Sequence, residues 1–216
     1  MSIEQQTFDE LVSGKVSFVR VREPEHDPGG SLDLVLCGSF NPFHEAHQAM
    51  AELALAKFQK QLEHFGDGNS EPALWFELSV SNVEKSALNF ETAKQRTSQT
   101  FGDPKFGVVL TSAPTFEEKL KLFPNSTFVV GADTILRIDD ARFYDNAEHR
   151  ERVLSSFEFQ DSKRPRFLVF GRWNEAGFVE GKREISELLS RQCQFISQTE
   201  FDMRISSTQI RKQKGN

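Results

Sequence analysis

The feature that most constrains the fold of this chain is an alternation of short apolar runs with longer amphipathic segments. The apolar runs lie at 32–37, 74–80, 106–111, 127–130, 166–170 and, more weakly, 194–197. Helical spacing of apolar residues is found between them, at 43–65, 90–100, 116–122, 146–157 and 182–192. Such an alternation predicts an α/β fold with a doubly wound, Rossmann-like parallel sheet. In such sheets the ligand lies beyond the carboxyl ends of the strands, so we expect the site there.

The length of the chain predicts a single domain. A chain of 216 residues can bury one α/β core well and is short for two. We therefore predict one domain over 1–216, with an N-terminal extension at 1–30 and a core at 31–216. The extension shows a helical pattern followed by a strand-like alternation at 16–21. It could cover a sheet edge or join a second subunit, which leaves a homo-oligomer open.

Charge and composition exclude several kinds of partner. The formal net charge of −6 argues against a general grip on nucleic acid or on an acidic membrane. No apolar stretch is long enough for a transmembrane span, and the first fourteen residues lack the apolar centre of a secretory signal. The two cysteines, Cys37 and Cys193, fit neither a zinc pattern nor a disulfide framework. We therefore expect a cytoplasmic protein. Any phosphate binding would have to come from a few residues at one site rather than from a basic surface.

The segment 38–47, GSFNPFHEAH, leaves the first core strand and enters the first core helix. Free backbone amides at a helix start suit an anion, and Gly38 lets a ligand come close. His44 and His47 are three residues apart, so both imidazoles can point at one phosphate. The alternative is that His44 caps the helix and that His47 is a hydrogen-bonded structural histidine or a surface histidine.

A second segment of this kind, RISSTQIR, lies near the C-terminus at 204–211. Ser206 and Ser207 are good N-cap residues and predict a short helix whose amino end faces an anion. Arg211, one turn further on, can add a charge-assisted contact to that anion. The alternative is a capped terminal helix with a solvated basic tail.

Both segments resemble motifs of the HxGH nucleotidyltransferase superfamily. Residues 38–47 are similar to its GSFNPxHxGH signature, and residues 205–211 to its ISSTxxR motif. The resemblance is strongest to the nicotinamide and nicotinate mononucleotide adenylyltransferases, since pantetheine-phosphate adenylyltransferases and cytidylyltransferases typically carry Asp in place of Asn41. Ala46 departs from the pattern, because the family has glycine there. The extra methyl group either shifts the nucleotide slightly or weakens ATP binding.

The resemblance implies an adenylyltransferase that joins ATP and nicotinamide mononucleotide to give NAD and pyrophosphate. The acceptor phosphate attacks the ATP α-phosphorus directly, so positioning and electrostatic stabilisation supply the catalysis. The catalytic residues it implies are His44, His47 and Arg211. The implied ATP site comprises Gly38, Ser39, Phe40, His44, His47, Gly131, Asp133, Ile205, Ser206, Ser207, Thr208 and Arg211. The implied acceptor site comprises Ser39, Asn41, Lys85 and Phe116. Mg²⁺ is expected to bind through the nucleotide phosphates, with no protein ligand.

Three polar residues each have two possible roles. Asp133, in a Gly-Ala-Asp turn after a strand, can accept from ribose hydroxyls or cap the helix that follows. Lys85 can meet the phosphate of the mononucleotide or simply be solvated. Arg96, on the helix after that loop, can brace the loop or face water.

The acceptor ring and the reaction itself also leave alternatives. The ring needs an apolar platform, for which Phe116, Trp173 and Phe143 are candidates; Phe116 is preferred, although core packing would also explain it. The rival functions are a transferase with another acceptor, a CTP-dependent cytidylyltransferase, and a nucleotide-binding sensor with weak turnover. Hydrolysis of ATP ranks last, because nothing marks a hydrolytic base.

Overall fold

In a computed structural model, the described residues of the chain are 3–25, 32–64, 71–81, 86–99, 104–159, 164–175, 177–213 and 215. The chain divides into two compact units. The first comprises Met1–Pro124 and Ile205–Asn216, and the second comprises Asn125–Arg204. Both units have the α/β architecture predicted from the alternation of apolar runs and amphipathic segments.

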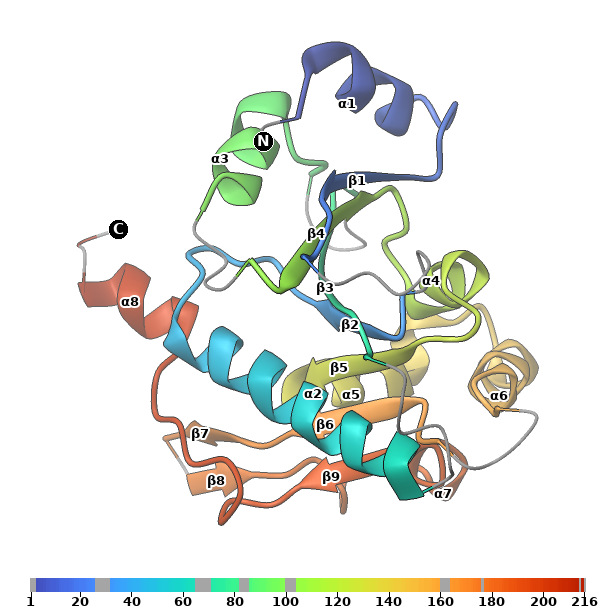
Figure 1. Cartoon of the computed structure of the whole chain (residues 1–216). Coiled ribbons are helices and arrows are strands. Elements are labelled where there is room, and N and C mark those ends of the chain that lie inside the picture. Colours follow the sequence, from blue (N-terminus) through green and yellow to red (C-terminus); the bar gives the residue numbers. More distant parts are fainter. Residues whose placement is uncertain are drawn as a thin grey trace. The chain divides into compact units, whose positions relative to one another are not determined.

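The first unit contains four sheet strands in the order β1-β4-β3-β2 (Figure 1). Its strands are β1 (Phe18–Arg22), β2 (Leu34–Cys37), β3 (Leu74–Ser79) and β4 (Phe106–Thr111). Its helices are α1 (Gln5–Val12), α2 (Glu45–His64), α3 (Phe90–Thr97), α4 (Phe116–Leu122) and α8 (Ser207–Gln213). Strands β2, β3 and β4 are parallel, so their carboxyl ends meet at one edge, where the loop into α2 begins.

The N-terminal extension covers an edge of this sheet. Strand β1 pairs antiparallel with β4, with Phe18 opposite Thr111. The ring of Phe8 on α1 packs edge-on against Phe90 of α3 at 5.7 Å between centroids. Pairing of β1 satisfies backbone groups that β4 would otherwise expose. Of the two roles expected for the extension, the structure shows the edge-covering one.

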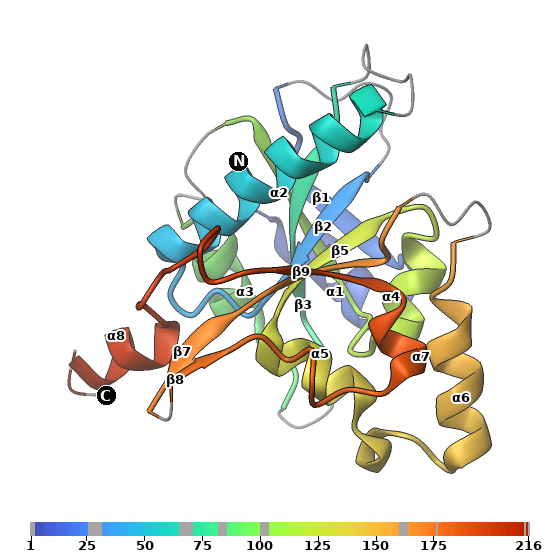
Figure 2. The ribbon, with the colours of Figure 1, turned by 90° about the horizontal axis from the view of Figure 1, so that it is seen from below.

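The second unit contains three parallel strands in the order β5-β6-β9 and a two-stranded hairpin, β7-β8. Its strands are β5 (Thr127–Gly131), β6 (Phe167–Phe170), β7 (Arg172–Asn174), β8 (Gly177–Val179) and β9 (Cys193–Ile196). Its helices are α5 (Ala132–Asp139), the 3₁₀ turn η1 (Ala141–Phe143), α6 (Ala147–Ser156) and α7 (Glu187–Ser190). Figure 2 shows α6 beside α7. The hairpin follows β6 in the chain after a single residue, Gly171.

The helix predicted at 182–192 is wrong in extent, because only Glu187–Ser190 is helical. Its start is fixed by Ser186, whose side chain caps the helix by accepting from the Leu189 N–H. The carboxylate of Asp139, distant in sequence, accepts from the Ser186 backbone N–H at 2.8 Å and from its hydroxyl at 2.6 Å. The hairpin at 172–179 was not predicted from the sequence.

The apolar runs form the core, as their lack of polar alternation predicts. In the first unit Leu34, Val35 and Trp75 are 0% exposed, and in the second unit Phe128 and Phe167 are also 0% exposed. Among the described residues, no helix has both the length and the apolar character needed to cross a bilayer.

Candidate functional site

The loop between β2 and α2 has a shape fixed by the packing of Phe40. The Phe40 backbone has a φ of +43°, a conformation that bulky residues rarely adopt, and its ring is 1% exposed. That ring meets Phe76 edge-on at 5.4 Å and His47 edge-on at 5.1 Å. A Cβ atom on Gly38 would lie 2.8 Å from Cε1 of the Phe40 ring. Residue 38 must therefore be glycine for this ring to fold back under the loop.

The two histidines at the start of α2 form a stacked pair. Their ring centroids are 3.8 Å apart, with 23° between the ring planes. The His44 backbone N–H donates to Nδ1 of His47 at 3.2 Å. Because Nδ1 is an acceptor in this bond, the proton of the neutral His47 ring lies on Nε2. The Nε2–H group is thus the donor that His47 can offer to a ligand.

Burial keeps both histidines neutral near pH 7. Desolvation, reinforced by the charge of His44, lowers the pKa of His47 to about 3. Desolvation also lowers the pKa of His44, partly opposed by Glu45. The Nδ1 atom of His44 is buried without a hydrogen-bond partner among the described residues. In the free protein, the positive charge near this loop therefore comes from arginines rather than from histidines.

The two motifs recognised in the sequence meet within the first unit (Figure 1). The Ser207 hydroxyl donates to the Pro42 carbonyl oxygen at 2.9 Å. Nη1 of Arg211 donates to the Asn41 carbonyl oxygen. The amino end of α8 is therefore hydrogen-bonded directly to the loop that leads into α2.

The residues of the second motif divide their roles at the start of α8. The Ser206 hydroxyl accepts from the Gln209 backbone N–H at 3.3 Å, so Ser206 is the N-cap. Nη2 of Arg211 donates to the Thr208 hydroxyl at 3.1 Å. Ile205 precedes the cap and is partly exposed. The helix start predicted from Ser206 and Ser207 is confirmed.

The last turn of α3 contacts the same loop from a different element. Nη1 of Arg96 donates to the Ser39 carbonyl oxygen at 3.2 Å, so Arg96 braces a loop, although a different one from the loop we expected. Desolvation and the charge of Arg211 lower the pKa of the Arg96 guanidinium. Neither arginine forms an ion pair with any other described residue. Two unneutralised cations therefore face the loop.

Gln99, after the end of α3, was missed by the sequence analysis. Its side chain bonds to the backbone of both Phe40 and Phe43. No sequence signal marks this residue, because its role depends on where α3 ends relative to a loop more than fifty residues earlier in the chain.

Gly131 and Asp133 lie in the second unit, at the carboxyl end of β5 and the start of α5. A Cβ atom on Gly131 would meet nothing within 4 Å, so space is open at that position. Asp133 does not cap α5, which rules out that alternative. Its carboxylate is instead 2.6 Å from Nη1 of Arg172, and both side chains are about half exposed. Arg172 was not singled out from the sequence.

Three of the four residues expected to bind the acceptor lie within the described part of the chain. Ser39 and Asn41 are exposed on the loop after β2. Phe116 is the first residue of α4 and is partly exposed, and it follows the N-cap Thr115. Lys85 lies outside the described residues.

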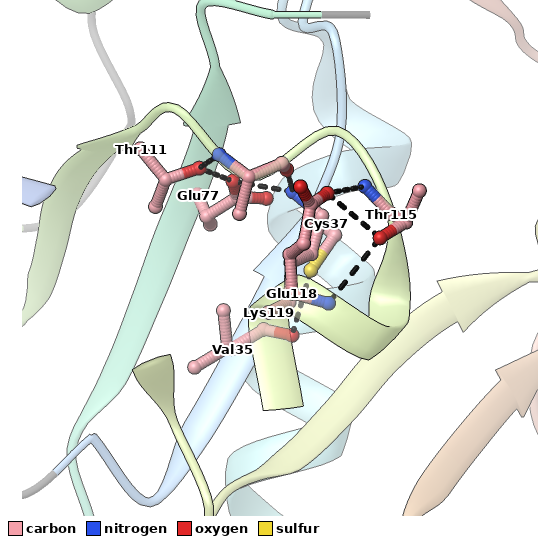
Figure 3. A network of polar contacts seen from close by, with 8 residues as sticks. Val35, Cys37, Glu77, Thr111, Thr115, Glu118 and Lys119 are labelled. Carbon is pink, nitrogen blue, oxygen red and sulfur yellow. Dashed lines mark hydrogen bonds and ion pairs between the residues drawn. The ribbon is translucent and has the colours of Figure 1, made fainter. Parts of the chain in front are cut away.

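A buried ion pair holds the loop that precedes α4 (Figure 3). Glu77 on β3 and Lys119 on α4 are 1% and 4% exposed, with 2.6 Å between Oε1 and Nζ. The Lys119 ammonium also donates to the Ala113 carbonyl oxygen at 2.8 Å, and the Thr111 hydroxyl donates to Glu77 at 2.5 Å. Burial raises the pKa of the neighbouring Cys37 thiol, so that thiol is not a nucleophile at neutral pH. The pair ties the 112–115 loop to the sheet.

Parallel strands ending in a glycine-led loop, a stacked histidine pair and a second helix start bonded to that loop together define a nucleotide-binding α/β protein. The model of the cytidylyltransferase-like family matches residues 35–213. The chain therefore belongs to the cytidylyltransferase-like family and is a nucleotidyltransferase.

No curated protein matches the chain. Two solved structures of Plasmodium falciparum nicotinic acid mononucleotide adenylyltransferase are similar to it, one complexed with NaAD and one with APC. Each shares 19% identity and covers 84% of this chain and 83% of its own, with TM-scores of 0.42 and 0.41 respectively.

Proposed function

We propose that this nucleotidyltransferase transfers the adenylyl group of ATP to nicotinamide mononucleotide, giving NAD and pyrophosphate. The observation that carries the proposal is the convergence of the two motifs in one unit. Ser207 and Arg211 of α8 bond to the loop that ends at His44. A triphosphate at this point would meet two helix starts, two guanidinium groups and a neutral imidazole donor.

The proposed reaction is a single displacement. An oxygen of the acceptor phosphate forms a bond to the α-phosphorus of ATP, and the bond from that phosphorus to the bridging oxygen of the β-phosphate breaks. Pyrophosphate leaves with the electron pair. The acceptor phosphate is already ionised at pH 7, so no general base is needed. The protein has to align the two nucleotides and stabilise the charge that shifts to the leaving group.

The residues of the first unit divide this work by their chemistry. The Nε2–H of His47 would donate to an α-phosphate oxygen, and His44, stacked on it, would contact the same phosphate. Arg211 and the hydroxyl and backbone groups at the start of α8 would hold the β- and γ-phosphates. An approaching triphosphate favours protonation of His44, which would then offset the developing charge.

The remaining roles follow the family resemblance. The Asp133 carboxylate would accept from the ATP ribose hydroxyls, and the open space at Gly131 would let the nucleotide pass close to the backbone. Ser39, Asn41, Lys85 and Phe116 would face the acceptor. Mg²⁺ would arrive on the phosphates; among the described residues, no group of three or more His, Cys, Asp or Glu side chains could hold a metal ion.

The choice of acceptor depends on the ring substituent. A carboxamide needs both a donor and an acceptor, whereas the carboxylate of nicotinate mononucleotide needs donors or a cation. Asn41 keeps the resemblance closest to the enzymes that act on these two mononucleotides.

The test is pyrophosphate release from ATP and Mg²⁺ with nicotinamide mononucleotide, with nicotinate mononucleotide and phosphopantetheine in parallel reactions. His47→Ala serves as the blank. Release with nicotinamide mononucleotide that is lost in the blank supports the proposal. Release of pyrophosphate with another acceptor, or with CTP in place of ATP, agrees with a nucleotidyltransferase but refutes the proposed substrates. Binding of ATP with no release under any condition favours a nucleotide-binding sensor.

A further inference from the structure

The side chain of Gln99 clamps the backbone of the loop between β2 and α2. Its Nε2 donates to the Phe40 carbonyl oxygen at 2.8 Å, and its Oε1 accepts from the Phe43 backbone N–H at 2.8 Å. The same Nε2 also donates to the Arg96 carbonyl oxygen at 3.1 Å, which holds the side-chain amide against the last turn of α3. The two bonds to the loop span Asn41–Pro42 and so fix the separation of Phe40 from Phe43.

We propose that Gln99 is the positioning residue of the nucleotide site, acting through this loop on His44 and His47. The proposal rests on the proposed function only for the identity of the ligand. The clamp joins one carbonyl acceptor and one N–H donor, and a carboxamide offers the matching donor and acceptor on a single planar group. A carboxylate can accept from Phe43 but repels the Phe40 carbonyl oxygen, and an aliphatic side chain can do neither.

The loop needs such a clamp because its backbone is strained. The left-handed conformation of Phe40 is unfavourable for a bulky residue, and it persists only if its surroundings hold it in place. Phe43 in turn carries the position of the loop to the histidines. Its ring stacks on His47 with 5.5 Å between centroids and 27° between the planes, and it immediately precedes His44 in the chain.

The loop between β2 and α2 is held both by residues at the end of α3 and by residues at the start of α8. Four consecutive loop carbonyls, of Ser39, Phe40, Asn41 and Pro42, accept from Arg96, Gln99, Arg211 and Ser207 respectively. In the proposed function Ser207 and Arg211 also contact the triphosphate. Gln99 is uncharged and is not among the proposed nucleotide ligands, so its two bonds serve only to hold the loop.

The test compares Gln99→Glu and Gln99→Met with the control Gln95→Glu. Gln95 is exposed on α3, and its side chain makes no hydrogen bond with a described residue. The first readout needs no ligand: the ring proton and carbon resonances of the histidines. We expect the His44 and His47 resonances to move in both Gln99 variants, while those of His64 and His149 stay in place.

The second readout is the dissociation constant of ATP. We expect it to rise about tenfold in both Gln99 variants, as for the loss of a hydrogen bond of ordinary strength, and to stay unchanged in the control. A protonated glutamic acid has one donor and one acceptor and so can replace the amide. The defect of Gln99→Glu should therefore shrink as the pH falls from about 8 toward about 4.3, the ordinary pKa of a glutamic acid, while that of Gln99→Met should not.

Histidine resonances and ATP affinity equal to those of the control would overturn the clamp, even if the protein transfers adenylyl groups. Loss of ATP affinity without rescue of Gln99→Glu at low pH would also overturn it, because a merely structural defect behaves in that way. Moved His44 and His47 resonances with rescue at low pH support it. If no nucleotide binds to the native protein, resonances that move in both variants and return at low pH in Gln99→Glu alone still establish the clamp, while the proposed function fails.

Discussion

The buried histidine pair predicts that folding stability depends on pH in a specific window. The pKa of His47 is lowered from 6.5 to about 3 in the folded protein. Between these values the unfolded chain binds a proton at residue 47 that the folded chain does not bind. The free energy of unfolding therefore falls as the pH is lowered through this window. A pH of 5 is about 1.5 units below the pKa of this histidine in the unfolded chain. The free energy of unfolding is therefore lower at pH 5 than at pH 7 by up to about 2 kcal/mol.

The assay is urea unfolding of the native protein and of His47→Gln at pH 7 and at pH 5. The glutamine oxygen can still accept from the His44 N–H, but the side chain does not titrate. We expect the native protein to lose up to about 2 kcal/mol more than the variant between the two pH values. Equal losses would refute the lowered pKa of His47.

Three further predictions concern other positions. Gly38→Ala should cost about 1–3 kcal/mol in urea unfolding, because the new methyl group meets the Phe40 ring; an unchanged midpoint would contradict this. Gly131→Ala should change stability by less than about 1 kcal/mol but raise the ATP dissociation constant, and unchanged affinity would remove Gly131 from the site. Lys119→Met should cost about 3–5 kcal/mol by leaving Glu77 buried and unpaired, and adding Glu77→Gln should recover most of it; a single-variant cost below about 1 kcal/mol would refute the buried pair.

Regular elements with strong apolar patterns were predicted well from the sequence. The strand at 106–111 and the helix at 116–122 have the predicted bounds, because the apolar run of the strand and the Thr115 capping box act locally. The helix at 182–192 was predicted wrongly, because Asp139 fixes Ser186 from a distant position in the chain. The β7-β8 hairpin was missed, since its strands are three residues long and carry no repeating pattern.

By itself, the sequence determined the α/β class, the family and the two motifs at 38–47 and 204–211, since these depend on local spacing and on runs of specific residues. Only the tertiary structure decided which side chains those motifs meet. It joined Arg211 to the Asn41 carbonyl, Gln99 to the Phe40–Phe43 backbone and Asp133 to Arg172. It also set the protonation state of His47, because burial and the neighbouring backbone N–H, rather than residue type, fix the pKa and the position of the proton.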